Sequence, residues 1–326
     1  MKHVLVTGGA GYIGSHICKS LFQKGYNPVT IDNLSLGHKQ AVKWGPLIQG
    51  NCGDKALLLK LFDDYPILGV IHLAALSNIR ESHRIPLQYY QNNVGATLNL
   101  LEVLKERRIS YFVFSSTCSI YGMPKKVPID ETHPKCSINT YGESKWMVER
   151  VLQTVSKSHG LKTATLRYFN AAGADPDGEI GESHHPETHL IPLLIQTAMS
   201  KRPHFTLFGE DHETEDGTPV RDFIHVTDLA NAHVQALEYM ITQEQNLTLN
   251  LGTGKGYSVR EVIDTIEKGW DLKIPIVSGE RFPGDPPILI ANAEKAQDIL
   301  GWFPQYSDIQ TIIETAWDWE SATAIV

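Results

Sequence analysis

The chain has 326 residues, 42% of them hydrophobic, and carries a formal net charge of −8 with a sequence pI near 5.9. This acidic balance, with no block of Lys or Arg, argues against a nucleic-acid-binding surface. No apolar run approaches the ~18 residues that a membrane span requires, and no signal-type stretch precedes the first strand. The four cysteines are scattered without a C-x-x-C spacing, which indicates free thiols in a reducing compartment. We therefore expect a cytoplasmic protein without nucleic-acid or membrane partners.

Short apolar segments alternate with helical periodicity up to about residue 168, a pattern typical of a parallel sheet covered on both faces. We expect a doubly wound α/β fold of Rossmann type, followed by a smaller C-terminal α/β region. The capping boxes Ser258–Glu261 and Ser307–Gln310 mark two helix starts in that region. The expected strands are His3–Thr7, Pro28–Asp32, Leu47–Gln49, Gly69–Ala75, Tyr111–Ser116, Lys162–Arg167 and Leu247–Leu251, and the expected helices are Tyr12–Lys24, Pro86–Arg107 and Thr140–His159.

The first strand runs into a glycine-rich turn, in which Gly9, Gly11 and Gly14 have the G-x-G-x-x-G spacing. Such glycines permit a tight turn and let backbone N–H groups approach a pyrophosphate at the start of the next helix. Asp32 ends the second strand, where a carboxylate accepts hydrogen bonds from an adenosine ribose and repels a 2′-phosphate. The turn therefore predicts NAD rather than NADP, although an acid at this position can also cap a turn.

Hydroxyl groups gather at the end of the strand Tyr111–Ser116, where Ser115, Ser116 and Thr117 can hold a substrate alcohol. Tyr141 and Lys145 follow on one face of a helix, one turn apart. A neighbouring cation lowers the pKa of a phenol from its ordinary value near 10, so Tyr141 can remove a proton from an alcohol. On their own, these two residues fit a solvated helix face better than a catalytic pair. The dinucleotide turn favours the catalytic interpretation.

With Thr117, Tyr141 and Lys145 in this order after such a turn, the chain resembles the extended short-chain dehydrogenase/reductase family. Further stretches resemble the UDP-glucose 4-epimerases of that family over nearly the entire chain: Gly8–His16, Asp32–Leu34, Tyr89–Val94, Tyr168–Asn170, Val220–Val226 and Arg281-Phe-Pro-Gly-Asp285. The resemblance implies an NAD-dependent isomerase of galactose metabolism. It would interconvert UDP-glucose and UDP-galactose through a 4-keto sugar and transient NADH, without an external oxidant.

The resemblance also implies a role for each matching residue. Tyr141 would remove the 4-hydroxyl proton, Thr117 would bridge that hydroxyl and Tyr141, and Lys145 would bind the nicotinamide ribose and lower the phenol pKa. The implied cofactor contacts are Gly8, Gly11, Tyr12, Ile13, Gly14, Asp32, Asn33, Asn51, Cys52, Asn93, Ser115, Tyr141, Lys145 and Tyr168. The implied UDP-sugar contacts are Thr117, Asn170, His189, Leu190, Phe208, Arg221, Arg281, Asp285 and Leu289.

Arg221 and Arg281 match diphosphate-binding arginines, and Asp285 a residue that holds the uridine ribose. For Arg221 considered alone, an ordinary salt bridge to a nearby acid is the commoner role. We expect an NAD-binding domain at 1–169, to which 221–252 returns, and a UDP-sugar-binding domain at 170–326. The family resemblance further implies a homodimer that pairs through the helices following Pro86 and Thr140.

Three residues depart from the family pattern. Asn51 replaces an Asp that contacts adenine, and Ser77 replaces a Lys near the cofactor phosphates of some members. Leu289 replaces a Tyr of members restricted to small hexoses, so UDP-N-acetylglucosamine and UDP-N-acetylgalactosamine become possible substrates, unless Leu289 merely packs in the core. Cys118-Ser119 stands where 4,6-dehydratases carry an Asp-Glu pair, which disfavours dehydration.

The same motifs fit two other functions, and a group of histidines suggests a metal site. A UDP-xylose/UDP-arabinose 4-epimerase would share every motif above, and a non-catalytic NAD-sensing regulator would retain the fold but usually lose the base. His184, His185 and His189 suggest a metal cluster, but they do not form H-E-x-x-H and Pro186 interrupts a helix. We predict no metal site.

Overall fold

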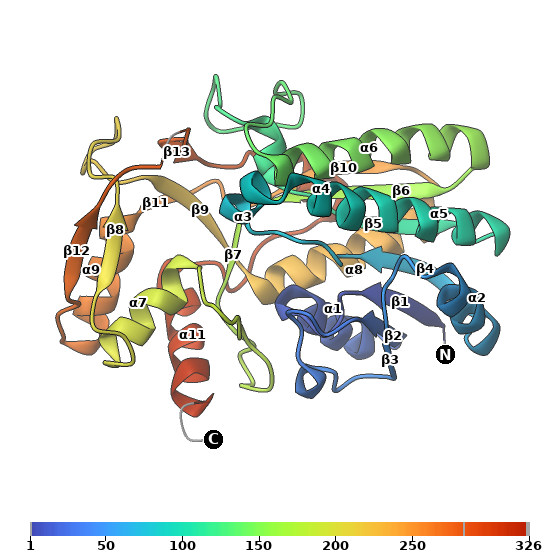
Figure 1. The fold of residues 1–326 in the computed structure, drawn as a ribbon, viewed down its shortest axis with the longest axis horizontal. Helices are drawn as coiled ribbons and strands as arrows, with labels where there is room; N and C mark the ends of the chain where they lie inside the picture. The colour runs from blue at the N-terminus through green and yellow to red at the C-terminus, as the bar shows by residue number, and fades with distance from the viewer. Residues whose placement is uncertain (1, 283, 324–326) are drawn as a thin grey trace.

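A seven-stranded sheet dominates the computed structural model, which describes residues 2–282 and 284–323 (Figure 1). Its order is β10-β6-β5-β4-β1-β2-β3, and every neighbouring pair is parallel. The strands are β1 (His3–Thr7), β2 (Asn27–Asp32), β3 (Leu47–Gln49), β4 (Ile67–His72), β5 (Tyr111–Ser115), β6 (Lys162–Tyr168) and β10 (Leu247–Leu251). The predicted doubly wound α/β fold is confirmed. Pro283, part of one predicted motif, lies outside the described residues.

Apolar cores cover both faces of this sheet. One core packs α1 (Tyr12–Gln23) and α8 (Val226–Gln243) against the strands, and the other packs α2 (Lys55–Asp64), α5 (Ala96–Glu106) and α6 (Thr140–His159). Val4 and Val6 belong to the first core and Leu5 to the second, and all three are fully buried. Successive side chains of a strand point to opposite faces, so a strand between two cores must be apolar throughout.

The predicted helix Pro86–Arg107 is interrupted. α3 (Ile79–Arg84) precedes α4 (Pro86–Tyr89), and a π-helical turn at Tyr90–Gly95 separates α4 from α5. Asn93 lies buried within that turn. In contrast, α6 spans the predicted residues; Asn139 caps its start and Gly160, with φ of 72°, ends it. Short 3-10 turns occur at Lys39–Ala41 and Cys118–Tyr121.

A second lobe lies beside the large sheet, at the left of Figure 1. Its central strand β9 (Val220–His225) pairs with β7 (Asn170–Ala172), β11 (Gly256–Ser258) and β13 (Ile288–Leu289), while β8 (Phe205–Phe208) pairs with β12 (Ile276–Gly279). A third core joins α7 (Leu190–Ala198), α9 (Val259–Trp270) and α11 (Ile309–Thr323) to these strands.

The chain returns to the large sheet after β9. α8 and β10 pack there, as does α10 (Glu294–Leu300) through Ala296. The return therefore begins at Val226, because Val220–His225 pairs within the smaller lobe. The division into two domains at residue 169 remains our proposal. Among the described residues, no helix combines the length and the apolar character needed to cross a bilayer.

Two predicted boundaries differ from the structure for a local reason. β4 ends at His72 rather than Ala75, because the N–H groups of Leu73 and Ala74 turn to the carbonyl and hydroxyl of Thr7. The capping box at Ser258 forms as predicted. That at Ser307 is wrong: the Ser307 hydroxyl donates to the buried carboxylate of Asp228 (2.7 Å), and Asp308 instead accepts from Thr311 N at the helix start (3.0 Å).

Candidate active site

The predicted cofactor and catalytic residues meet at the carboxyl edge of the large sheet. The winding direction reverses between β1 and β4, which is the switch point where open α/β sheets bind ligands. Gly8 follows β1, Ser115 ends β5 and Tyr168 ends β6. Parallel pairing brings these positions, far apart in the sequence, to one edge.

The glycine turn has a backbone that other residues would not permit. Gly8 has φ of 72°, and a Cβ added to Gly14 would lie 2.1 Å from the Gly8 carbonyl oxygen. Gly11 is the N-cap of α1 and supplies no side-chain cap, so the first N–H groups of the helix face outward without a protein side chain. A pyrophosphate suits such a turn because its oxygens accept hydrogen bonds from these N–H groups.

Asp32 holds the turn in place. Its Oδ2 accepts from Ala10 N (3.0 Å) and its Oδ1 from Leu34 N (2.8 Å). Asp32 therefore caps the turn, as the alternative role predicted. Each carboxylate oxygen still has a second lone pair for a ribose hydroxyl. Asn33 Oδ1 accepts from Ser35 N (3.0 Å), and Asn51 Oδ1 accepts from Gly53 N (2.7 Å). Both amides therefore shape their loops.

Three other predicted cofactor contacts are mostly buried around the turn. The Tyr12 hydroxyl donates to the Gly173 carbonyl oxygen (2.5 Å), and Ile13 packs against the first core. Cys52 is buried, and burial raises the pKa of its thiol to about 11. Each can contact a cofactor through its backbone or apolar surface rather than through a charged group.

Asn93 connects the loop after β4 to the start of α6. Its Nδ2 donates to the Leu76 carbonyl oxygen (2.9 Å) and to Ser144 Oγ (3.0 Å), and its Oδ1 accepts from Leu76 N (2.8 Å). The Ser144 hydroxyl in turn donates to the carbonyl of Tyr141 (2.7 Å). Asn93 therefore positions the helix turn that carries Tyr141, and a cofactor contact of its own remains a prediction.

Tyr141 and Lys145 lie on one face of the first two turns of α6, and both are buried. Lys145 Nζ lies 6.0 Å from the centre of the Tyr141 ring and donates to the Ser115 carbonyl oxygen (2.9 Å). Thr117 follows β5, and its Oγ1 accepts from Ser119 N (3.1 Å). The structure thus brings together the three residues predicted to be catalytic.

The pKa values differ from the sequence-based expectation. Burial raises the pKa of the Tyr141 phenol well above its ordinary value, as does the nearby Tyr168, while a hydrogen bond with Thr117 lowers it. Burial also lowers the pKa of Lys145 to about 7, against opposing effects of Cys52 and Glu149. The net shift of the phenol pKa is therefore upward, opposite to the expected direction, because loss of hydration dominates. The effect of Lys145 on the phenol stays a prediction.

Ser115 and Tyr168 complete the wall beside Tyr141. His233 Nδ1 donates to the Leu229 carbonyl oxygen (2.8 Å), so its Nε2 accepts from the Ser115 hydroxyl (2.7 Å). Burial lowers the pKa of His233 to about 4, which keeps this ring neutral. Burial raises the pKa of Tyr168 to about 12, so Tyr168 also stays protonated.

The predicted nucleotide-binding residues come from the second lobe. Arg221 on β9 lies 2.7 Å from Asp285 Oδ1, and Arg281 donates to the Asp285 carbonyl oxygen (3.3 Å). Asn170 lies on β7, in register with Phe223, and Leu289 on β13, in register with Arg221. Leu289 also packs against the cluster of Cys118, Ile120, Tyr121, Ile129, Phe169 and Ala291.

Phe208 forms an aromatic pair that the sequence did not predict. Its ring centre lies 4.8 Å from that of Phe282. Arg80 of α3 covers both rings, with its guanidinium carbon 3.5 Å from the Phe282 centre and 4.8 Å from the Phe208 centre. No spacing in the sequence connects α3 to these two phenylalanines, so Arg80 was missed.

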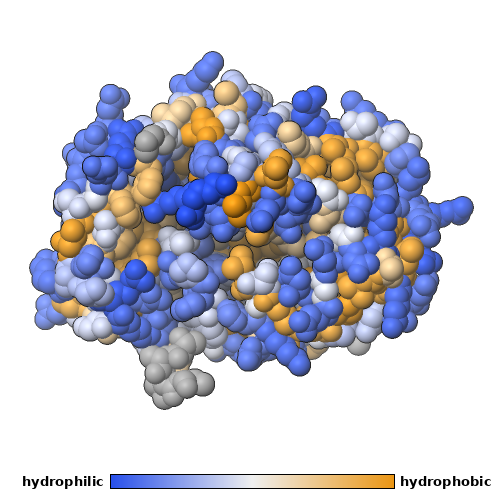
Figure 2. Space-filling model, viewed as in Figure 1, coloured by the Kyte–Doolittle hydropathy of each residue, from blue (hydrophilic) through white to orange (hydrophobic). Residues whose placement is uncertain are grey.

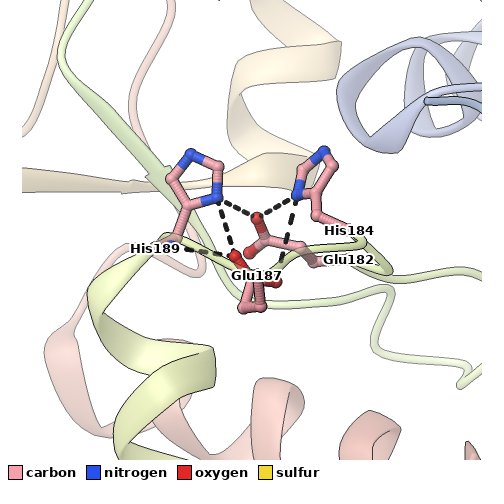
Figure 3. A group of neighbouring side chains, drawn as sticks. All are labelled: Glu182, His184, Glu187 and His189. Carbon is pink, nitrogen blue, oxygen red and sulfur yellow. Dashed lines mark hydrogen bonds and ion pairs between the residues drawn. The ribbon is translucent and has the colours of Figure 1, made fainter. Parts of the chain in front are cut away.

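His189 belongs to a network of two imidazoles and two carboxylates, shown in Figure 3. Its Nδ1 lies 2.5 Å from Glu182 Oε1 and 3.2 Å from Glu187 Oε1, and His184 Nδ1 lies 2.9 Å from Glu182 Oε1. Partial loss of hydration opposes a charge on His189, whose side chain is half exposed, but the two carboxylates outweigh this effect and raise its pKa. His189 precedes α7, and the predicted uridine-segment residue Leu190 begins that helix.

The four donor groups lie within 4.8 Å of one another, as metal ligands would. Two ligands of a tetrahedral zinc ion would stand ~3.3 Å apart, given metal–ligand bonds of about 2.0–2.1 Å. The separation of 2.5 Å between His189 Nδ1 and Glu182 Oε1 is instead a hydrogen-bond distance. Shared protons account for the network. His185, the third histidine of the predicted motif, is not among these four groups.

Comparison with known proteins agrees with this architecture. The NAD dependent epimerase/dehydratase family model matches residues 4–252. The chain belongs to this family. A family member from Rhizobium leguminosarum bv. trifolii, described as a UDP-glucose 4-epimerase, is 49% identical over 98% of this chain and 97% of its own length.

Solved structures of family members superimpose closely. The UDP-glucose 4-epimerase of Brucella ovis in complex with NAD is 45% identical, with a TM-score of 0.95 over 97% of this chain and 98% of that one. The Stenotrophomonas maltophila enzyme, solved with NAD and formylated UDP-arabinopyranose, is 37% identical, with a TM-score of 0.96 over 100% of this chain and 99% of that one. The family assignment of the sequence is therefore confirmed, and NAD is the family's cofactor.

Proposed function

We propose that this chain is a UDP-glucose 4-epimerase, which interconverts UDP-glucose and UDP-galactose. The observation that carries the proposal is the convergence of Thr117, Tyr141 and Lys145 beside the dinucleotide turn. The Rhizobium relative that shares 49% of the sequence supports the substrate assignment.

The residues around the turn suit NAD. The first N–H groups of α1 would bind the pyrophosphate, Asp32 the adenosine ribose, and Lys145 the nicotinamide ribose. NAD held there would supply a reversible hydride acceptor for C4 of the sugar, so no external oxidant would be consumed. Ser115 and the protonated Tyr168 form the wall of the site without adding charge.

Tyr141 exchanges the proton of the sugar's 4-hydroxyl, and Thr117 orients that hydroxyl. Because burial raises the phenol pKa, the phenolate needs the Thr117 hydrogen bond and a positive charge nearby. Lys145 can supply that charge: with a pKa of about 7, a substantial fraction carries a proton at neutral pH. When the sugar is reduced again at C4, Tyr141 would return the proton to the same oxygen.

The nucleotide end of the substrate would bind in the second lobe. Arg221 and Arg281 converge on Asp285, which places two forked donors at one point. We assign them to the diphosphate, with Asn170 as a further phosphate donor and Asp285 as an acceptor for the ribose hydroxyls. Phe208, 37% exposed, offers an aromatic face for the uracil. His189 and Leu190 would contact the uridine from the start of α7.

The chain also carries a surface suited to self-association. Leu87 is 74% exposed, Leu98 41% and Met147 39%, and these residues lie on α4, α5 and α6. Figure 2 shows apolar surface gathered over this side of the molecule. We assign it to the interface of a homodimer, in which the apolar side chains of two copies would be buried together.

A pentose is the second candidate substrate. The Stenotrophomonas structure favours a pentose substrate, because that family member, which has the same fold, was solved with bound formylated UDP-arabinopyranose. UDP-xylose and UDP-arabinose differ from the hexoses at C6, away from C4. All the residues assigned above would serve either reaction.

The test is to incubate the purified protein, without added NAD, with UDP-galactose, UDP-arabinose and UDP-N-acetylgalactosamine, and to separate the products by chromatography. We expect the protein to purify with NAD bound and to turn over UDP-galactose. Ser77, in place of a lysine near the cofactor phosphates, weakens retention, so added NAD should restore activity after dilution. Release of one NADH per product would contradict epimerisation, and turnover of UDP-arabinose alone would favour the pentose reaction.

A further inference from the structure

Arg80 joins the two lobes of the molecule. It belongs to α3, in the connection between β4 and α4 of the large sheet, whereas its partners follow β12 and end β8 of the second lobe. Its guanidinium carbon lies 3.5 Å from the centre of the Phe282 ring and 4.8 Å from that of Phe208. The planes of the two rings are inclined at 53° to each other, and we call this pair of rings the aromatic corner.

The stacking leaves the hydrogen-bonding edge of the guanidinium available. A guanidinium that lies over an aromatic face keeps its N–H donors in its own plane, directed away from the ring. Within the described residues, none of these donors has a hydrogen-bond partner or an ion pair. Arg80 is thus an exposed side chain fixed by two rings, with its donors still free to bind.

The charges around Arg80 favour an anion. Asp285 is near enough to raise the pKa of Arg80, although the partial loss of hydration around this otherwise exposed side chain lowers it more. The same Asp285 already binds Arg221 through its carboxylate and Arg281 through its carbonyl oxygen. Three arginines, from α3, β9 and the segment after β12, therefore lie around Asp285, and its carboxylate is ion-paired with Arg221 alone.

We propose that Arg80 is a diphosphate-binding residue that clamps the nucleotide of the substrate against the second lobe. The proposal rests on the proposed function in one respect, that the anion is the diphosphate of a UDP-sugar. A planar fork held by stacking loses little freedom when it binds phosphate oxygens, so Arg80 can contribute affinity from the opposite lobe to Arg221 and Arg281. Binding would also hold the two lobes together.

A purely structural role is the alternative, in which Arg80 only holds the aromatic corner together. Calorimetric titration of the NAD-containing protein with UDP and with uridine separates the two roles, since uridine lacks the diphosphate. Arg84→Ala is the control, because Arg84 ends the same helix. Arg80→Lys keeps the charge but loses the planar fork.

We expect Arg80→Ala to raise the Kd for UDP by ~10-fold or more, the range for a charge-assisted phosphate contact, and to leave the Kd for uridine within about twofold. The Kd of Arg80→Lys for UDP should lie between those of wild type and Arg80→Ala, and the Kd of Arg84→Ala should equal that of wild type. In turnover, KM should rise more than kcat falls. An unchanged Kd for UDP, or equal losses for UDP and uridine, would overturn the proposal.

Failure of the clamp is distinguishable from failure of the proposed function. Suppose that Arg80→Ala raises the Kd for UDP as expected but wild type epimerises no UDP-sugar. Arg80 then binds the diphosphate, and the reaction assignment is wrong. If wild type epimerises UDP-galactose and Arg80→Ala binds UDP normally, the clamp alone is wrong.

Discussion

Arg221 and Asp285, both assigned by family resemblance to the UDP site, bind each other with 2.7 Å between guanidinium nitrogen and carboxylate oxygen. The commoner role of an arginine, a salt bridge with a nearby acid, is therefore confirmed for Arg221. It does not exclude phosphate binding. Nη2 of Arg221 donates to Asp285 and Nη1 to the carbonyl oxygens of Val220 (2.9 Å) and Pro287 (3.5 Å), so Nε and the second hydrogen of Nη2 are left for a ligand. The acid orients the arginine.

Asp285→Asn should weaken UDP-sugar binding rather than unfold the protein. The pair is partly exposed, so it contributes at most about 1 kcal/mol to stability. Loss of the charge that orients Arg221 should raise KM for UDP-galactose by ~10-fold. Steady-state kinetics and thermal unfolding on the same preparations check this. A large fall in Tm with an unchanged KM would indicate a structural role.

Tyr141→Phe should keep NAD and UDP binding and reduce turnover by at least ~10²-fold, the usual scale for a positioned proton-transfer group. Only the phenolic oxygen is removed, and the buried ring is kept. Lys145→Met should reduce turnover similarly and also weaken NAD binding. Single-turnover measurements with bound NAD report on the chemical step. Wild-type rates for Tyr141→Phe would require a different base.

Lys145 should make stability depend on pH in a defined direction. Its pKa is about 7 in the folded chain and 10.5 ordinarily, so between these values the unfolded state binds more protons and stability rises with pH. Below pH 7 both states are protonated, and the cost of burying the charge is fully present. NAD-free Lys145→Met should therefore be more stable than NAD-free wild type below pH 7, with the difference vanishing toward pH 10.5. A difference in Tm that stays constant from pH 6 to 10 would refute this.

The network of Glu182, His184, Glu187 and His189 should not depend on a metal. Chelation followed by dialysis should leave Tm and activity unchanged, because protons account for its contacts. His189→Gln should lower stability by at most about 1 kcal/mol, since Glu182 loses a half-exposed imidazole partner and keeps His184. Elemental analysis of the dialysed protein, with one metal ion per chain, would show that this assignment is wrong.

Leu289 should set the range of accepted sugars. It is partly buried beside Cys118 and Phe169 and in register with Arg221, so it lies near both the catalytic loop and the nucleotide site. We expect measurable epimerisation of UDP-N-acetylglucosamine by wild type. Leu289→Tyr should abolish that activity and leave UDP-galactose turnover within a few-fold, because filling a pocket penalises only the larger ligand. Equal effects on both substrates would assign Leu289 to core packing alone.

The sequence by itself determined the features that depend on local pattern. Short apolar segments predicted the strands of the large sheet, since a strand buried on both faces is apolar throughout. The glycine spacing predicted the turn at Gly8–Gly14, and helical periodicity placed Tyr141 and Lys145 on one face. Each of these follows from backbone geometry over a few residues.

Only the tertiary structure decided which distant groups meet and how water is excluded from them. Arg80 contacts Phe208 and Phe282 across the two lobes, and no local period records that contact. Burial reversed the expected shift of the Tyr141 pKa, because hydration is lost only when the lobes and helices pack. Ser307 left its predicted cap for Asp228 for the same reason: a buried carboxylate from a distant helix competes more strongly than the local backbone.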